Sequence, residues 1–228
     1  VAATSLDTAL AAGVRLADNL TVEDIATEAT ASTTYSKNTT GSSNIILTAS
    51  DGNWSIAASA LSPDLDNDIK YAGNLTVTGI ATETGASTTY SKTNTGGSNV
   101  TLTASDGTWS IETGALNTDL DNDIKYAGAL TVTGIATGNK ATALTAYTTA
   151  KTGATTNALT ANGTWSLAKS ALDTALDAGV RLVGDLTVTG ILNDDEAAAL
   201  TDYTTAKTGA TKNTLTADGA WSIAVSDL

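Results

Sequence analysis

A tryptophan recurs at near-constant spacing along this chain, at Trp54, Trp109, Trp165 and Trp221. Each lies in nearly the same phrase, which reads Leu-Thr-Ala, then Asp-Gly or Asn-Gly, then Trp-Ser and an aliphatic residue. The period is about 55 residues, and self-similarity at such a period is the sequence signature of a repeat architecture. Four near-copies of one unit are more typical of a surface, a rod or a wall than of a single enzyme pocket.

The repeats also predict the domain organisation. Four repeats cover residues 6–60, 61–115, 116–171 and 172–228, and residues 1–5 duplicate the strand that follows the last tryptophan. The two halves of a repeat vary independently. Repeats 1 and 4 share Gly-Val-Arg-Leu in their first halves, whereas repeats 3 and 4 share Tyr-Thr-Thr-Ala-Lys in their second halves. Such exchangeable halves indicate modules that meet through a common backbone interface.

Composition excludes several functional classes. The chain has no His and no Cys, so the usual acid–base and nucleophilic residue sets are missing, and we expect that it is not an enzyme. Its net charge of −13 argues against nucleic-acid partners, which are bound by basic patches. No apolar run approaches the length of a membrane-spanning helix, so membrane insertion is not expected.

Alternation of residue types predicts strands and hairpins. Leu75-Thr76-Val77 recurs in every repeat, with β-branched and apolar residues at every second position, as in a half-buried strand. Asp106-Gly107 supplies the positive φ of a two-residue hairpin turn, which would place Leu102 and Trp109 on one apolar face. In repeats 3 and 4 the segment before the tryptophan lacks one residue. A three-residue loop there would keep the leucine opposite the tryptophan, so we predict such a loop in these two repeats. The predicted repeat core is Leu47, Trp54, Ile56, Leu75, Val77, Leu102, Trp109, Ile111, Leu159, Trp165, Leu215 and Trp221.

These patterns together predict an all-β fold. We expect a tandem array of four repeats, elongated, either solenoid-like or built of serial small sheets. A few short helical turns are expected within residues 6–13 and 172–179 and in the acidic stretch that precedes Ala197. A four-bladed propeller is the alternative architecture.

Two clusters of alternating carboxylates invite a metal hypothesis. Calcium is held by six to eight oxygen ligands, and an Asp-x-Asp-x-Asp stretch can supply several of them. The competing interpretation is a solvated acidic turn, because no Gly or closing Glu completes a helix–loop–helix calcium site. The candidate ligands are Asp64, Asp66 and Asp68 in repeat 2 and Asp119, Asp121 and Asp123 in repeat 3. No other cofactor is expected.

The two ends of the chain repeat one segment. Val1-Ala2-Ala3 matches Ile223-Ala224-Val225, and both match Ile56-Ala57-Ala58, which follows Trp54-Ser55. Self-contained repeat arrays usually carry atypical polar caps, whereas these ends resemble interior positions. We therefore expect either a longer native chain or subunits that join end to end through open strand edges.

Residues 73–79 read Gly-Asn-Leu-Thr-Val-Thr-Gly, and residues 128–134 and 184–190 nearly repeat this phrase. The phrase resembles repeats of bacterial surface adhesins and phage tail fibres. That resemblance implies a β-rich, elongated protein built by strand addition. With the repeats and the open ends, it favours a structural, self-assembling subunit of an extracellular or cell-surface filament, sheath or surface layer, whose partners are copies of itself. The alternative is an adhesin or tail-fibre module that presents glycan or calcium sites.

Overall fold

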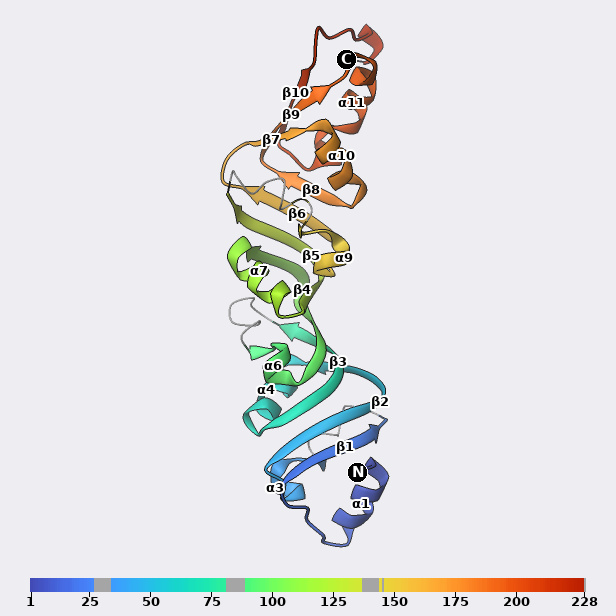
Figure 1. The fold of residues 1–228 in the computed structure, drawn as a ribbon, viewed down its shortest axis with the longest axis vertical. Helices are drawn as coiled ribbons and strands as arrows, with labels where there is room; N and C mark the ends of the chain where they lie inside the picture. Colours follow the sequence, from blue (N-terminus) through green and yellow to red (C-terminus); the bar gives the residue numbers. More distant parts are fainter. Residues whose placement is uncertain (27–33, 81–88, 137–143, 145, 228) are drawn as a thin grey trace. The chain divides into compact units, whose positions relative to one another are not determined.

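The computed structural model describes residues 1–26, 34–80, 89–136, 144 and 146–227 (Figure 1). Contacts divide the chain into two compact units. Unit 1 contains Val1–Gly107 together with Thr118–Tyr126, and unit 2 contains Thr108–Asn117 together with Ala127–Leu228.

The prediction of an all-β fold is wrong, because helices connect the strands. Of the described residues, 32% are helical and 44% lie in strands, so the fold is mixed α/β and the description as β-strand rich holds only in part. A nine-residue helix lies near the start of each repeat, and a four-residue helix lies in its second half. The long helices are α1 (Ala3–Ala11), α4 (Ala58–Asp66), α7 (Thr113–Asp121) and α10 (Lys169–Asp177), and the short ones are α3 (Lys37–Thr40), α6 (Lys92–Thr95), α9 (Thr149–Thr152) and α12 (Thr205–Thr208). Repeat 4 adds η3 (Asn193–Asp195), α11 (Glu196–Asp202) and η4 (Val225–Asp227).

The long helices are fixed by packing and not by helix propensity. Helix α7 reads Thr-Gly-Ala-Leu-Asn-Thr-Asp-Leu-Asp, which contains few strong helix formers. Each long helix buries one leucine completely, namely Leu6, Leu61, Leu116 or Leu172. A nine-residue helix anchored mainly by one side chain gives almost no 3.6-residue periodicity. The sequence therefore predicted only helical turns at two of these places.

The strands of unit 1 pair in the order β1 (Asn19–Ile25), β2 (Asn44–Ala57), β3 (Ile69–Ile80) and β4 (Gly97–Glu112). Every registered pairing among them is parallel. Parallel neighbours need a crossover connection, which is usually a helix, and α3, α4 and α6 lie in these connections. The parallel pairing also contradicts a propeller, whose blades are antiparallel.

Unit 2 is built in the same way. Strands β5 (Ile124–Ile135), β6 (Thr156–Ala161) and β8 (Val180–Val183) pair in that order. A second group pairs in the order β10 (Lys212–Ala217), β9 (Asp185–Ile191) and β7 (Trp165–Ala168). All these pairings are parallel as well.

The predicted hairpins are also wrong. Asp51 and Gly52 lie inside the continuous strand β2, and Leu47 pairs with Tyr71 of the next strand while Trp54 pairs with Leu75. Gly52 takes the expected positive φ of 76°, and the Asp51 carboxylate accepts a hydrogen bond of 2.9 Å from the backbone N–H of residue 53. The local geometry bends the strand without reversing it. In repeat 3 the shorter turn separates β6 from β7, which pair with different strands.

Burial alternates along the strands, so one sheet face is apolar and the other is open. In unit 1, Leu75 and Val77 are 1% and 0% exposed on the face that α4 covers. On the opposite face Ser55, Thr76 and Thr101 lie side by side in register. Parallel sheets are usually covered on both faces, and this one carries hydroxyl and amide side chains on its open face.

Candidate functional site

Successive repeats meet where the second half of one repeat pairs with the first half of the next, and we call this contact a junction. In unit 1 the junction is β2 against β3, and it pairs Leu47 with Tyr71 and Trp54 with Leu75. All four side chains are at most 2% exposed. The Trp54 indole N–H donates to the carbonyl of Ala72 at 3.0 Å, and its ring meets Tyr71 edge-on at 4.8 Å. We call this contact the tyrosine junction.

The junction in unit 2 joins β6 and β7 to β8 and β9. It pairs Asn157 with Val180 and Trp165 with Leu186, and these four residues are completely buried. The Trp165 indole N–H donates to the carbonyl of Val183 at 3.2 Å. We call this contact the asparagine junction. Both junctions therefore hide an indole ring and satisfy its single donor with a backbone carbonyl of the following repeat.

The buried polar groups differ between the two junctions. In the tyrosine junction the Tyr71 hydroxyl donates to Asp64 of α4 at 2.5 Å. In the asparagine junction the corresponding positions hold Leu182 and Ala175, which are 0% and 2% exposed. There the Asn157 amide donates to the carbonyl of Tyr147. Each junction thus satisfies its own polar atoms, as burial requires.

The last repeat presents the same side chains without a following strand. We define the C-terminal edge as Leu200, Tyr203, Asn213, Leu215, Trp221 and Ile223, which line a hollow of about 390 Å³. Leu215, Trp221 and Ile223 are half-buried, whereas their counterparts Leu159, Trp165 and Leu167 are 0–5% exposed. Within the described residues, β10 pairs only with β9, and the Trp221 indole has no acceptor.

A buried carboxylate supports the segment that carries Trp221. Glu196, at the start of α11, is 1% exposed, and its Oε2 accepts the backbone N–H of Ser222 at 2.5 Å. Its Oε1 has no partner among the described residues. Backbone N–H groups of neighbouring residues in an extended segment point to opposite sides. The hydrogen bond to Glu196 therefore leaves the N–H of Ile223 directed away from α11, on the side where a further strand would pair.

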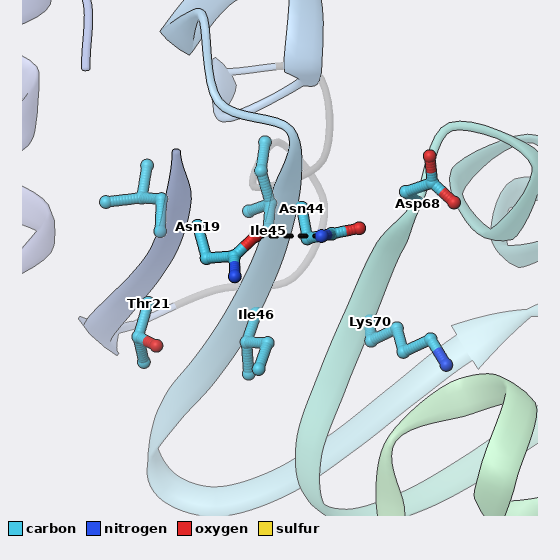
Figure 2. A pocket seen from close by; sticks show the side chains of 8 residues that line it. Asn19, Thr21, Asn44, Ile45, Ile46, Asp68 and Lys70 are labelled. Atoms are coloured by element: carbon cyan, nitrogen blue, oxygen red, sulfur yellow. Dashed lines mark hydrogen bonds between the residues drawn. The ribbon is translucent and has the colours of Figure 1, made fainter. Parts of the chain in front are cut away.

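The first repeat presents the complementary side. We define the N-terminal edge as Val14, Leu16 and strand β1. Val14 is 48% exposed, whereas its counterparts Ile69 and Val180 are 1% and 0% exposed. Figure 2 shows Asn19 and Thr21 of β1 beside Asn44 and Ile46 of β2, where these residues help to line a hollow of about 340 Å³.

Chain residues 1 and 2 touch the outer side of β1. The amino group of Val1 donates to the carbonyl of Thr21 at 2.8 Å, the N–H of Glu23 donates to Val1 at 2.9 Å, and Ala2 bridges to Glu23 in parallel. The same bridge joins Ala57 to Thr78 in the tyrosine junction. Val1 and Ala2 therefore lie beside β1 at the place that the end of β2 takes beside β3 in the tyrosine junction.

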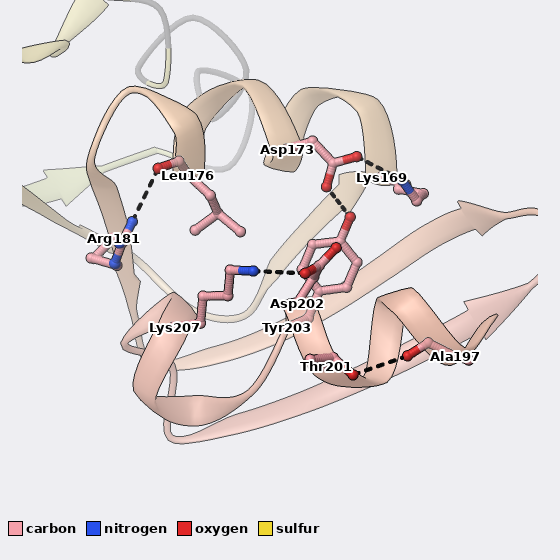
Figure 3. A network of polar contacts seen from close by, with 9 residues as sticks. All are labelled: Lys169, Asp173, Leu176, Arg181, Ala197, Thr201, Asp202, Tyr203 and Lys207. Atoms are coloured by element: carbon pink, nitrogen blue, oxygen red, sulfur yellow. Dashed lines mark hydrogen bonds and ion pairs between the residues drawn. The ribbon is translucent and has the colours of Figure 1, made fainter. Parts of the chain in front are cut away.

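A polar network fastens the helices behind the C-terminal edge (Figure 3). The Tyr203 hydroxyl donates to Asp173 of α10, and Lys169 forms an ion pair with the same carboxylate at 2.7 Å. Burial, together with the hydrogen bond to Asp173, raises the pKa of Tyr203 above its ordinary value. Lys207 pairs with Asp202 at 2.6 Å. These contacts fix α10 against the segment that leads to β10.

The six candidate calcium ligands do not converge. Asp64 accepts from Tyr71 and Asp119 from Tyr126. Asp68 pairs with Lys37 at 2.7 Å and Asp123 with Lys92 at 2.8 Å, and these hydrogen bonds and charges hold the pKa of Asp68 and Asp123 below the usual value. Asp66 and Asp121 end α4 and α7. Among the described residues no three acidic groups are arranged to hold a metal ion.

The remaining sequence-selected residues fall into two groups. The interior members of the predicted core are at most 8% exposed, whereas Leu215 and Trp221 lie half-buried in the C-terminal edge. Of the selected end residues, Ala3 is buried, Val1 is 51% exposed and Val225 is 89% exposed. The sequence analysis did not select Val14, Leu200 or Glu196 as site residues, although the repeat alignment could have shown that Val14 matches the strand residue Val180.

None of the helices in the described ranges is both long and apolar enough to cross a membrane. Comparisons with protein-family models, with curated proteins and with solved structures found no match.

Proposed function

We propose that this chain is a structural subunit that associates with further copies of itself through its two open strand edges. One observation carries the proposal. Trp221 and Leu215 are half-buried at the C-terminal edge, while Trp165 and Leu159, at the same places one repeat earlier, are completely buried by the next repeat. The chain thus displays one side of a contact that it buries in its own interior.

The expected association is weak. Fully burying a large apolar side chain contributes about 1.5–3 kcal/mol, so covering a half-buried one contributes roughly 1 kcal/mol. The C-terminal edge has four half-buried apolar side chains, and the N-terminal edge adds Val14 and Leu16. Covering these six side chains contributes roughly 6 kcal/mol, and hydrogen bonds between the strands add to it. The four side chains are those of Leu200, Leu215, Trp221 and Ile223. Association costs about 4–15 kcal/mol in lost freedom. The dissociation constant is therefore expected to be micromolar or weaker.

Charge makes this association dependent on salt. The net charge of −13 means that two copies repel one another at low ionic strength. Salt shortens the screening length from about 30 Å at 0.01 M to about 8 Å at 0.15 M. Association is expected to strengthen as salt is added.

Sedimentation velocity over a wide range of protein concentration tests the proposal. The parent protein should form larger species as concentration rises, and Trp221→Asp should remain monomeric. Thr101→Asp is the matched control, because Thr101 lies in β4 on the open sheet face, on a strand that belongs to neither edge, and the substitution adds a negative charge as well. A monomeric parent at all concentrations, or equal effects of the two substitutions, would contradict the proposal.

Other expectations from the sequence remain predictions. They are the extracellular or cell-surface location, the filament, sheath or surface-layer form, the absence of enzymatic activity, and the alternative adhesin role with glycan ligands.

A further inference from the structure

Junction chemistry follows a rule that links the two sides of each contact. Second halves that contain Ile45, or Val100 at the corresponding strand position, are followed by first halves that contain Ile-Lys-Tyr, in repeats 2 and 3. The second half that contains Asn157 at that position is followed by Val-Arg-Leu, in repeat 4. The halves of one repeat vary independently, but the halves that meet at a junction vary together.

The structure gives a physical reason for this pairing. In the tyrosine junction the Tyr71 ring fills the space beside Trp54 and requires Asp64 for its hydroxyl. In the asparagine junction Leu182 and Ala175 fill that space with no polar atom to satisfy. Tyr71 and Asp64 belong to the same side of the junction, so replacing that side alone by its asparagine-type counterpart would put a leucine in place of the tyrosine ring and leave a void beside the Trp54 indole.

Backbone spacing distinguishes the junctions a second time. In the tyrosine junction a Cβ at Gly73 would lie 2.5 Å from the carbonyl oxygen of Gly52, so only glycine fits there. In the asparagine junction the turn before Trp165 is one residue shorter. A Cβ at the corresponding Gly184 meets no described atom within 4 Å. Only the asparagine junction has room for a side chain at this place.

Both open edges belong to the asparagine type. The N-terminal edge reads Val14-Arg15-Leu16, has Ala9 where the tyrosine type has Asp64, and carries Asp18, with a φ of 68°, at the place of Gly73. The C-terminal edge carries Asn213 and the shorter turn before Trp221. The C-terminal edge corresponds to β6 and β7, and the N-terminal edge corresponds to β8 and β9. The two edges are therefore complementary in the way that these strands are.

From this match, and resting on the proposed function, we infer that the C-terminal edge of one copy binds the N-terminal edge of a second copy, head to tail, in the register of the asparagine junction. Leu215 then pairs with Leu16 of the second copy, and Trp221 pairs with its Leu20. The Trp221 indole N–H donates to the carbonyl of Ala17 of the second copy, the counterpart of Val183. Ile223 and Ala224 take the place on β1 that Val1 and Ala2 hold in the isolated chain.

This contact joins two different surfaces, so each added copy leaves one free edge of each kind. Such heterologous contacts produce open-ended chains of copies unless the rotation between them closes a ring. A contact of like edges would stop at a dimer.

Thiol crosslinking tests the register, because the chain has no cysteine of its own. Ser222→Cys in one preparation and Thr21→Cys in another are mixed and treated with a short bifunctional thiol reagent. The pair Ser166→Cys and Thr187→Cys in a single chain is the positive control, because these residues already face one another in register. We expect crosslinked dimers that contain one copy of each variant, at a yield close to that of the control, and little crosslinking of either variant alone.

Other outcomes separate the two proposals. Dimers of Ser222→Cys with itself, or association by sedimentation without the mixed crosslink, would overturn the head-to-tail register and leave self-association standing. A crosslink within one chain that carries both substitutions, at a dilution where the protein is monomeric, would show that the two ends pair with each other and would overturn the second copy as the occupant. Absence of any association would overturn the proposed function itself.

Discussion

Trp165 and Trp221 occupy the same place in two successive repeats and have different surroundings. Trp165 is completely buried and its indole donates to Val183, whereas Trp221 is half-buried over an open hollow. Their local sequences are nearly identical, Gly-Thr-Trp-Ser and Gly-Ala-Trp-Ser. The difference shows that burial of this residue is supplied by the following repeat and not by its own.

The largest expected effect is a direct test of this difference. Trp165→Ala should lower the free energy of unfolding by about 3–5 kcal/mol, because it leaves a large cavity in a closed core. Trp221→Ala should cost roughly 1 kcal/mol in the monomer, because part of its surface is already in water. Urea unfolding of both variants at a concentration where the parent is monomeric provides the measurement. Equal losses would break the comparison.

Glycine substitutions sharpen the distinction between the two junction types. Gly73→Ala should cost about 2–5 kcal/mol, because its methyl group would overlap the Gly52 carbonyl and its φ of 103° strains any side chain. Gly184→Ala carries only the backbone strain, since no described atom lies within 4 Å, and should cost roughly 1–2 kcal/mol. Thermal and urea unfolding distinguish the two. A larger loss at residue 184 would refute the spacing argument.

Repeat 1 can be probed through Tyr35, whose hydroxyl donates to Asp7 of α1 at 2.8 Å. Burial and this hydrogen bond raise the pKa of Tyr35 from 10.0 to about 12. A folded-state pKa above the unfolded one means that the stabilisation is fully present below pH 10 and is lost as the pH rises through about 12. Tyr35→Phe should cost about 1–3 kcal/mol at pH 8.

The stability difference between the parent and Tyr35→Phe should shrink between pH 10 and 12, measured by urea unfolding across that range. A difference that stays constant through this range would show that the hydroxyl makes no pH-dependent contribution to the packing of α1.

The smallest expected effect concerns competition at the N-terminal edge. Removing Val1 and Ala2 frees the positions on Thr21 and Glu23 that the incoming Ile223 and Ala224 would take. Two exposed backbone hydrogen bonds are worth roughly 1 kcal/mol in total, so the dissociation constant should fall severalfold in sedimentation equilibrium. Weaker association of the shortened chain would show instead that Val1 and Ala2 contribute to the contact.

Part of this architecture was readable from the sequence. The alternation in Leu-Thr-Val placed apolar side chains on one face of a strand, and β3 has that face buried. Strand direction was not readable, because this parallel sheet leaves one face open and its strands therefore alternate in the way that is typical of half-buried antiparallel strands. Asp51-Gly52 misled for the same reason, since a left-handed glycine serves a bulge as well as a hairpin turn.

Only some residues of the two edges could be predicted from the sequence. Repetition of the end segments pointed to Ile223 and Ala224, but the role of Val14 depended on knowing that the preceding helix returns the chain parallel to its neighbour. Glu196 could not have been found, because it lies in a stretch where repeat 4 departs from the other repeats. Its contact with Ser222 spans 26 positions, and only the folded backbone shows it.

The helical crossovers have a consequence for how such a gene can grow or shrink. Because every crossover returns the chain in the same direction, loss or duplication of a segment between two junctions of the same type leaves both remaining contacts intact. Recombination between the near-identical phrases of repeats 2 and 3 would yield proteins of different length that carry unchanged ends.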